Sequence, residues 1–233
     1  MADQSHEHMS EALVQGAAKP QFGEVRIRNR GRLPHWEKEE GLYFITFHLA
    51  DSLPQHAINE MVERNRILAA AKRAGARLTP AQEVFAAKYS QKRIEEYFDR
   101  GIGKCLLKDL RVAESMVRAL RFWHGKRYRL VAWCIMPNHV HVVCRLLPGQ
   151  NLSDILRGWK VYSARETNRI LGRKGTIWRR EYCDRLIRGD GEFQRAVQYV
   201  LSNPERAELK NWKWVWSEGR EALSTAGQET GGT

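Results

Sequence analysis

The sequence RYRLVAWCIMPNHVHVVCRL, from Arg127 to Leu146, decides the fold. Its two halves, Arg127 to Met136 and His139 to Leu146, are rich in β-branched, aromatic and other apolar residues, as strands are. Pro137-Asn138 lies between them and breaks the first run. The sequence therefore predicts two consecutive strands that pair as a β-hairpin.

The segments on both sides of this hairpin complete an α+β pattern. Before the hairpin, the patterns predict a strand over 42–50 and a helix over about 110–123. After it, they predict a helix over 152–171, a short strand over 182–188 and a last helix over 192–203. This order matches a ferredoxin-like βαββαβ core with an antiparallel sheet, a helical insertion and a C-terminal helix.

Composition divides the chain into three parts. We expect a flexible basic N-terminal arm over residues 1–32 and the core over residues 33–210. Residues 211–233 should form a C-terminal tail. Within the core part, residues 55–105 predict the helical insertion. Its second helix should begin at Thr79-Pro80-Ala-Gln82, which has the spacing of a capping box, and run to about Asp99.

The C-terminal tail carries tryptophans at alternate positions, Trp212, Trp214 and Trp216. Such a stripe can stack on unpaired nucleobases. More often it packs a tail onto its own domain, and we favour this interpretation.

The charge balance indicates a polyanionic partner. Lysine and arginine number 39 against 27 aspartates and glutamates, which gives a net charge of +12. A surplus of this size favours nucleic acid over a membrane surface. No run of about 18 apolar residues occurs, so no membrane span is expected. The four cysteines have no CxxC spacing, so a zinc ribbon is not expected and a reducing cytoplasm is the simplest location.

Two groups of basic residues are candidates for DNA contact. The first has an arginine at every second position, which in an extended chain places all four on one side: Arg26, Arg28, Arg30 and Arg32. A disordered basic tail is the alternative. The second group follows the predicted helix over 152–171 and the next loop: Lys160, Arg165, Arg169, Arg173, Lys174, Arg179 and Arg180. Any of these could instead be an ordinary solvated charge.

His139 and His141 are the candidate metal ligands. Residues two apart on a strand face the same side, so both imidazoles should point to one place while Val140 and Val142 face the other way. Two neutral imidazoles can share one divalent ion. Taken alone, the pair could equally be two half-buried histidines without a ligand.

Several stretches together resemble a known family. They are LPHWE (Leu33 to Glu37), LYFITFHLADSLP (Leu42 to Pro54), RYRLVAWCIMPNHVHVV (Arg127 to Val143), IWRREYCDRLIR (Ile177 to Arg188) and YVLSNPERAEL (Tyr199 to Leu209). The histidine, bulky apolar residue, histidine pattern at 139–141 resembles the HUH endonucleases. Within them the chain is most similar to the REP-associated tyrosine transposases, which are IS200-like single-tyrosine enzymes. The resemblance covers roughly residues 33–216.

The resemblance implies a function and a cofactor. Such enzymes bind hairpin DNA of repetitive extragenic palindromes, and they cut and rejoin single strands. Mg²⁺ or Mn²⁺, held by the two histidines and a polar residue, polarises the scissile phosphate. A tyrosine on the last core helix attacks phosphorus and stays joined to the 5′ phosphate. No nucleotide cofactor is implied, and the active form is a monomer or a homodimer.

Two tyrosines are candidates for the nucleophile. Tyr199 is followed four residues later by Asn203, and Tyr162 by Glu166, so spacing alone does not decide between them. The resemblance selects Tyr199, which lies five residues before the proline of an Asn-Pro pair. It also implies Asn203 as the third metal ligand, although Asn203 could instead cap the helix. Pro204 disfavours a helical conformation at Asn203, so that helix should end there.

Glu181 and Asp184 are candidates for orienting a histidine or accepting a proton. Ion pairs with neighbouring arginines are at least as plausible for both. Two rival functions remain. One is a hairpin-binding protein that has kept the fold without the chemistry. The other is a replication or conjugation relaxase, which is disfavoured because paired tyrosines and a helicase extension are absent.

Overall fold

The computed structural model describes residues 25–30, 33–88, 97–98 and 100–219 of the chain. Its centre is a five-stranded antiparallel sheet with the strand order β6-β3-β5-β4-β7. The strands are β3 (Leu42–His48), β4 (Tyr128–Ile135), β5 (His139–Leu146), β6 (Cys183–Leu186) and β7 (Val215–Ser217). Without β7, this is the strand order of a ferredoxin-like sheet, so the predicted α+β fold is confirmed. The predicted hairpin is the pair β4 and β5.

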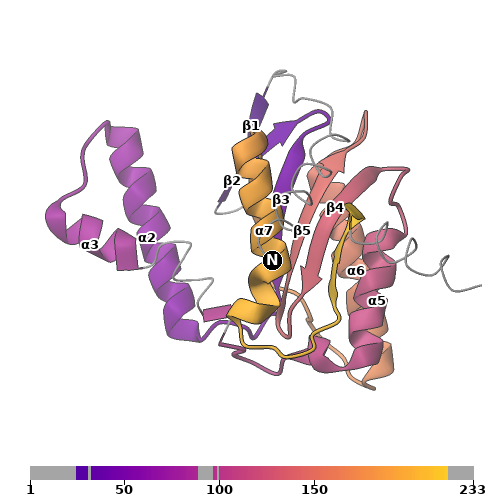
Figure 1. Cartoon of the computed structure of the whole chain (residues 1–233). Coiled ribbons are helices and arrows are strands. Elements are labelled where there is room, and N and C mark those ends of the chain that lie inside the picture. Colours follow the sequence, from indigo (N-terminus) through magenta and orange to yellow (C-terminus); the bar gives the residue numbers. More distant parts are fainter. Residues whose placement is uncertain (1–24, 31–32, 89–96, 99, 220–233) are drawn as a thin grey trace, which may run out of the picture.

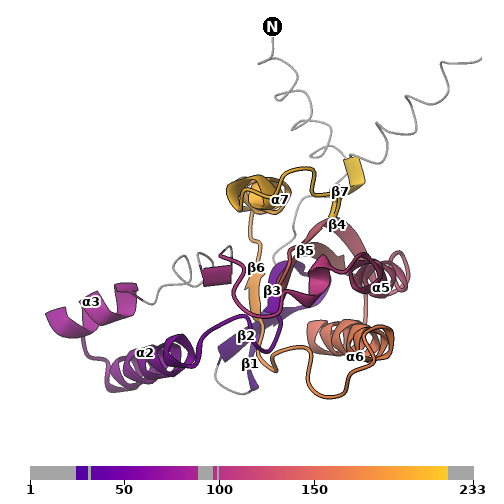
Figure 2. The same ribbon diagram turned by 90° about the horizontal axis from the view of Figure 1, so that it is seen from below.

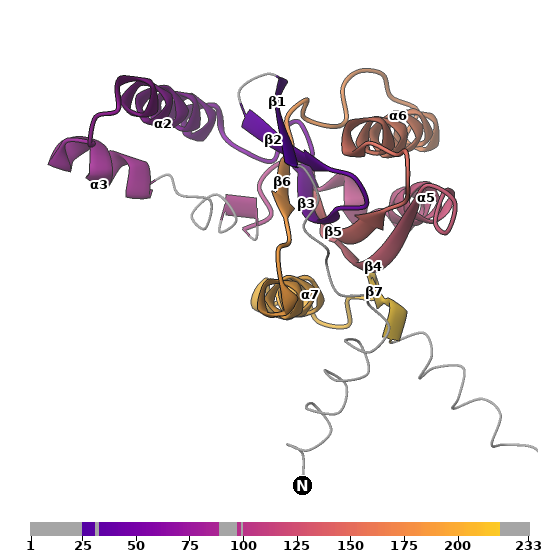
Figure 3. The ribbon, with the colours of Figure 1, turned by 90° about the horizontal axis from the view of Figure 1, so that it is seen from above.

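Helices cover the two faces of the sheet unequally. Helices α5 (Leu110–Arg121) and α6 (Leu152–Ile170) lie on one face, and α7 (Asp190–Arg206) lies alone on the other (Figures 2 and 3). Side chains alternate along each strand, so every central strand contributes residues to both faces.

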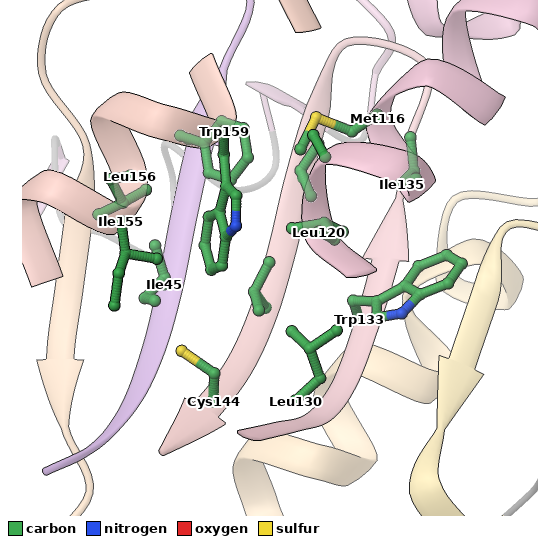
Figure 4. Close-up of a cluster of buried hydrophobic side chains, with 14 of the residues drawn as sticks. Ile45, Met116, Leu120, Leu130, Trp133, Ile135, Cys144, Ile155, Leu156 and Trp159 are labelled. Atoms are coloured by element: carbon green, nitrogen blue, oxygen red, sulfur yellow. The ribbon is translucent and has the colours of Figure 1, made fainter. Parts of the chain in front are cut away.

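The face under α5 and α6 holds the larger hydrophobic core. Ile45, Leu130, Ile135 and Trp159 belong to one buried cluster, which Figure 4 shows in close-up. Within it, Trp159 Nε1 donates to the hydroxyl of Tyr128 at 2.7 Å, whereas the buried Nε1 of Trp133 makes no hydrogen bond. The stability of the domain therefore rests mainly on this face.

The face under α7 holds a second, smaller cluster. The apolar side chains of α7 pack on alternate residues of the sheet, and the cluster contains Leu42, Phe44, Ala132, Cys134, Met136, Val143, Ile187, Phe193, Ala196, Val197 and Val200. From α7, the apolar residues expected at helical spacing all contribute: Phe193, Ala196, Val197 and Val200 are buried, and Leu201 packs against the cluster while only partly buried.

The predicted end of α7 is wrong. The helix continues through Pro204 to Arg206 instead of stopping at Asn203. Proline removes one backbone hydrogen bond and only disfavours a helical residue before it. Here Asn203 and Pro204 are both buried, and the amide of Ala207 still donates to the carbonyl of Asn203 at 3.1 Å. Tertiary packing outweighs the local preference.

The helical insertion extends away from the sheet (Figure 1) and contains α2 (Gln55–Ala74) and α3 (Pro80–Lys88). The predicted capping box is confirmed: Thr79 N donates to Gln82 Oε1 at 2.9 Å, and Gln82 N donates to Thr79 Oγ1 at 3.3 Å. The described helix ends at Lys88, and most of the rest of the range predicted to Asp99 lies outside the described residues. The chain then returns to the sheet and forms the short helix η1 (Leu106–Lys108).

The two ends of the described chain are paired strands, which the sequence did not predict. The arginine-rich stretch is extended, as expected, but as β1 (Val25–Arg30) it pairs with β2 (Leu33–Lys38), so the predicted free arm is wrong for these residues. Arg32 lies outside the described residues. At the other end, β7 joins the sheet edge, and Trp212 Nε1 donates to the carbonyl of Ile135 at 2.8 Å. The described part of the tail, residues 211–219, is therefore packed on its own domain, and the rest of the tail lies outside the described residues.

Candidate active site

The two histidines of β5 lie under α7. His139 and His141 are both fully buried, and their Nε2 atoms are 3.0 Å apart. Val140 and Val142 point into the core on the opposite face. The predicted alternation along this strand is confirmed.

Each imidazole is held through its other nitrogen. His139 Nδ1 lies 2.7 Å from Asn138 Oδ1, and His141 Nδ1 lies 2.8 Å from Thr46 Oγ1. Thr46 reaches His141 because the two residues are directly opposite in the pairing of β3 with β5. These contacts aim both Nε2 atoms at the same point.

Burial keeps both rings neutral at physiological pH. Loss of hydration lowers the pKa of His141 to about 3, and the charge of Arg206 acts in the same direction. Burial also lowers the pKa of His139 well below its ordinary value, with His141 next in importance. A neutral imidazole is the form that binds a metal ion.

Tyr199 lies beside this pair. Its ring is 5.2 Å from that of His141 and 5.6 Å from that of Phe44, edge-on in both cases. The guanidinium carbon of Arg206 is 4.7 Å from the centre of the Tyr199 ring. Tyr199 is only partly buried, so its side chain combines contact with His141 and access from outside.

Asn203 contributes a buried amide from the next turn of α7. Its side chain is fully buried, and neither of its amide atoms makes a hydrogen bond. It is near enough to His139 to oppose the fall in that ring's pKa. A buried amide without hydrogen bonds costs about 1–3 kcal/mol of folding free energy. Such an amide therefore indicates a place where a ligand can bind.

The residues present fit a divalent cation. Two ligands about 2.1 Å from one ion at a right angle are about 3.0 Å apart, which is the observed separation of the Nε2 atoms. Among the described residues no group of three His, Cys, Asp or Glu side chains could hold a metal ion. The donors that the structure brings together here are the two imidazoles and, beside His139, the Asn203 amide.

The structure separates the other tyrosine candidate from the histidines. Tyr162 is on α6, on the opposite face of the sheet, and its side chain is exposed. Glu166, its partner at four residues, pairs with Arg169 at 2.8 Å. Tyr162 and the imidazole pair are not brought together.

The predicted orienting carboxylates do not hold the histidines. Asp184 is opposite Ile45 in the pairing of β6 with β3, so it shares the α6 face of the sheet with Ile45. Glu181 acts electrostatically on Lys160. The sequence reasoning missed Asn138 and Thr46, which perform this role. Asn138 is adjacent to His139 and could have been suspected, whereas Thr46 requires the strand register.

The basic residues predicted on and after the helix over 152–171 do not form one surface beside Tyr199. Arg165 and Arg169 of α6 are exposed on the face away from Tyr199. Lys160 donates to the carbonyl of Arg180 at 3.0 Å, and burial lowers its pKa to about 8. The backbone amide of Arg179 donates to the carbonyl of His48, at the end of β3.

Arginines near Tyr199 were not among the predicted DNA contacts. Arg206 lies over the Tyr199 ring, and Arg185 lies 5.4 Å from the centre of the Phe44 ring. Arg206 is seven residues after Tyr199, on the same helical face. The sequence predicted that the helix ends at Asn203, so Arg206 was not expected to share a helical face with Tyr199.

This arrangement agrees with a comparison against known families. A family model described as "Transposase IS200 like" matches residues 82–203, more than half of the chain. The chain therefore belongs to the IS200-like transposases. Membership confirms the expected class, a transposase that processes DNA. No curated protein matches the chain.

Two solved structures are similar to this chain. One is a REP-associated tyrosine transposase bound to a REP hairpin, with 15% identity, a TM-score of 0.45 and coverage of 88% of this chain and 87% of that chain. The other is a putative transposase from Deinococcus radiodurans, with 14% identity, a TM-score of 0.30 and coverage of 80% and 98%. In the described residues, no helix is long and apolar enough to cross a bilayer.

Proposed function

We propose that this chain is a metal-dependent single-strand DNA endonuclease and strand transferase that acts on REP-type hairpin DNA through Tyr199. The supporting observation is the contact of the Tyr199 ring with the buried imidazole pair, at 5.2 Å from His141. The transposase domain would comprise residues 33–210, with an insertion at about 55–105.

Tyr199 supplies the nucleophile in this mechanism. Its phenolic oxygen attacks phosphorus, a bond from tyrosine to the 5′ phosphate forms, and the bond to the 3′ oxygen breaks, which releases a 3′ hydroxyl. Rejoining is the reverse: a 3′ hydroxyl attacks the phosphotyrosine and the phenol leaves. A phenol ordinarily has a pKa of about 10. The phenol therefore gives up its proton as the bond to phosphorus forms, and the departing 3′ oxygen takes up a proton. The Arg206 guanidinium lies over the ring, 4.7 Å from its centre.

His139, His141 and Asn203 would hold Mg²⁺ or Mn²⁺, which when bound neutralises charge that develops on the non-bridging phosphate oxygens. The chain's own part is to keep the two imidazoles neutral by burial and their Nε2 atoms 3.0 Å apart. Asn203 and Tyr199 are on one helix, so α7 positions the third ligand and the nucleophile together.

Arginines beside the site would bind the backbone near the cut. Arg185 and Arg206 lie over Phe44 and Tyr199 on the α7 face. The basic residues of α6 and its following loop would contact the hairpin farther from the cut: Lys160, Arg165, Arg169, Arg179 and Arg180. The arginines of the N-terminal stretch, Arg26, Arg28, Arg30 and Arg32, would contact further phosphates.

The test is to incubate the protein with single-stranded REP hairpin DNA and Mn²⁺ and resolve covalent adducts on a denaturing gel. We expect an adduct that disappears in Tyr199→Phe and persists in Tyr162→Phe, the matched control on the opposite face. Adduct formation by Tyr199→Phe would contradict the proposal. Tight binding without an adduct under any divalent ion would instead indicate a hairpin-binding protein.

A further inference from the structure

Asn138 connects the histidine pair to the helical insertion. Its side chain is buried, its Nδ2 donates to the carbonyl of Ile102 at 3.0 Å, and its Oδ1 lies 2.7 Å from His139 Nδ1. A carbonyl oxygen only accepts hydrogen bonds, so the amide nitrogen must face Ile102 and the amide oxygen must face His139. The amide oxygen also only accepts. The proton of neutral His139 is therefore on Nδ1, and its Nε2 carries a lone pair.

His141 is not fixed in the same way. Its Nδ1 partner is the hydroxyl of Thr46, which can donate or accept. The 3.0 Å between the two Nε2 atoms is also a hydrogen-bond distance, and in metal-free protein a nitrogen–nitrogen hydrogen bond needs one hydrogen along the contact. Because His139 Nε2 is the acceptor, His141 Nε2 must donate. His141 Nδ1 then accepts from Thr46.

The five groups thus form one directed chain of hydrogen bonds. Thr46 donates to His141, His141 to His139, His139 to Asn138, and Asn138 to the carbonyl of Ile102. For both Nε2 atoms to bind a cation, only His141 has to move its proton from Nε2 to Nδ1. The Thr46 hydroxyl would then turn from donor to acceptor.

The Ile102 end of this hydrogen-bond chain is firmly anchored. Ile102 belongs to the return segment, Arg100–Cys105, which leads from the insertion back to the sheet. In it, Lys104 N donates to Asp51 Oδ2 at 3.0 Å. A Cβ atom on Gly103 would lie 2.6 Å from the carbonyl oxygen of Asp51, so this approach requires glycine. The carbonyl that orients Asn138 is therefore held against the end of β3.

Phe98 adds a second contact from the same insertion. It is buried, and its ring lies 5.3 Å from that of His139 and 4.5 Å from that of His48. The imidazole of His139 is thus in contact with the insertion through its ring face and, by way of Asn138, through its Nδ1 atom. His141 instead lies against Phe44 and Tyr199.

We propose that the return segment, acting through Asn138, locks His139 in the Nδ1-protonated tautomer with Nε2 ready for a cation, while His141 changes tautomer when the cation binds. Asn138 is a positioning residue in this scheme, because it acts only through His139. The insertion then does more than extend the surface: it sets the geometry of one metal ligand. The hydrogen-bond chain stands on the structure, and only the cation step rests on the proposed function.

Nitrogen NMR of the histidine rings tests the lock directly. In the metal-free protein at pH 7, two-bond ¹⁵N–¹H spectra should show His139 with a bare Nε2 and His141 with a bare Nδ1. This measurement needs no variant. A wild-type spectrum with His139 protonated on Nε2 would overturn the proposal.

Substitution of Asn138 sharpens the test. Asn138→Leu removes the acceptor, so the Nε2-protonated form of His139 should become a major species. Asn138→Asp keeps an acceptor for Nδ1 and should retain the wild-type tautomer. Asn168→Leu is the matched control, because Asn168 also donates to a backbone carbonyl, that of Gly175, but far from the histidines. An unchanged His139 tautomer in Asn138→Leu would overturn the lock.

Mn²⁺ titration by calorimetry separates this proposal from the proposed function. Asn138→Leu should weaken Mn²⁺ binding about 10- to 100-fold, with Asn138→Asp close to wild type. On binding, the His141 signal should change to the Nδ1-protonated form while His139 keeps its tautomer. Wild-type protein that shows the predicted tautomers but binds no Mn²⁺ would contradict the metal role and support the lock. Normal Mn²⁺ binding by Asn138→Leu would contradict the lock alone.

Discussion

The two faces of the sheet are built from the same strands but serve different purposes. On the α5 and α6 face, β5 contributes Val140 and Val142 to a large apolar core. On the α7 face, the same strand contributes His139 and His141, both fully buried. The period of two along a strand separates stabilising residues from residues that carry the proposed chemistry. A single substitution can therefore address one face while leaving the other nearly intact.

The largest expected effect comes from removing an imidazole from the α7 face. His139→Ala and His141→Ala should each lower the rate of adduct formation by about 10³-fold or more and abolish Mn²⁺ binding. The fold should survive, because the larger core is on the other face. Rates of adduct formation and calorimetric titration measure these effects. His56→Ala, an exposed histidine of α2, is the control and should behave like the wild type.

The buried imidazoles also make the protein sensitive to acid. Burial lowers the pKa of His48 and of His141 to about 3 from an ordinary value of 6.5. Below about pH 6.5 the unfolded chain takes up protons that the folded chain refuses, so the free energy of unfolding falls as the pH falls. The slope is at most about 1.4 kcal/mol per pH unit for each ring.

Urea unfolding at pH 7, 6 and 5 measures this slope. His48→Gln should reduce this slope by the contribution of one imidazole. A free energy of unfolding that stays constant from pH 7 to pH 5 would show that the rings are not held neutral by burial.

A matched pair of phenylalanines on β3 distinguishes the two faces more finely. Phe47 packs against Trp178 at 4.9 Å, whereas Phe44 packs against His141 and Tyr199. Phe47→Leu and Phe44→Leu should each cost about 1–2 kcal/mol of unfolding free energy, because the volume change is similar. Only Phe44→Leu should slow adduct formation, by about 10-fold, since it removes the packing that positions the Tyr199 nucleophile and the His141 ligand. Equal slowing by both variants, measured well below their melting temperatures, would argue against this division.

The last expected effect concerns Lys160 of α6 and bears on stability alone. Burial lowers its pKa to about 8 from 10.5, so the folded protein loses this proton before the unfolded chain does. The free energy of unfolding should therefore contain a contribution that rises between pH 8 and pH 10.5. Lys160→Met should remove that contribution. If the free energy of unfolding rises equally in the wild type and in Lys160→Met, the rise comes from other groups.

Much of the fold could be predicted because it depends on local periodicity. The β4–β5 hairpin, the orientation of His139 and His141, and the apolar stripe of α7 all follow from patterns within a few residues. The strand pairs at the two ends, β1 with β2 and β7 with β4, carry no comparable local signal. Their partners are decided by what the rest of the sheet leaves available.

The site was less predictable because its supports come from distant segments. Thr46 meets His141 only through the register of β3 with β5. The carbonyl that orients Asn138 is that of Ile102, 36 residues away. Arg206 was missed because Pro204 suggested an earlier helix end. In each case tertiary contacts determine a detail that propensity and spacing do not contain.

The central claim is that α7 presents Tyr199 to the imidazole pair as the attacking group. Peptide mapping by mass spectrometry of the adduct formed with hairpin DNA and Mn²⁺ tests this most directly. The account predicts one modified peptide, with the 5′-phosphorylated nucleotide on Tyr199. A modified Tyr162, or any other residue on the far face of the sheet, would contradict it.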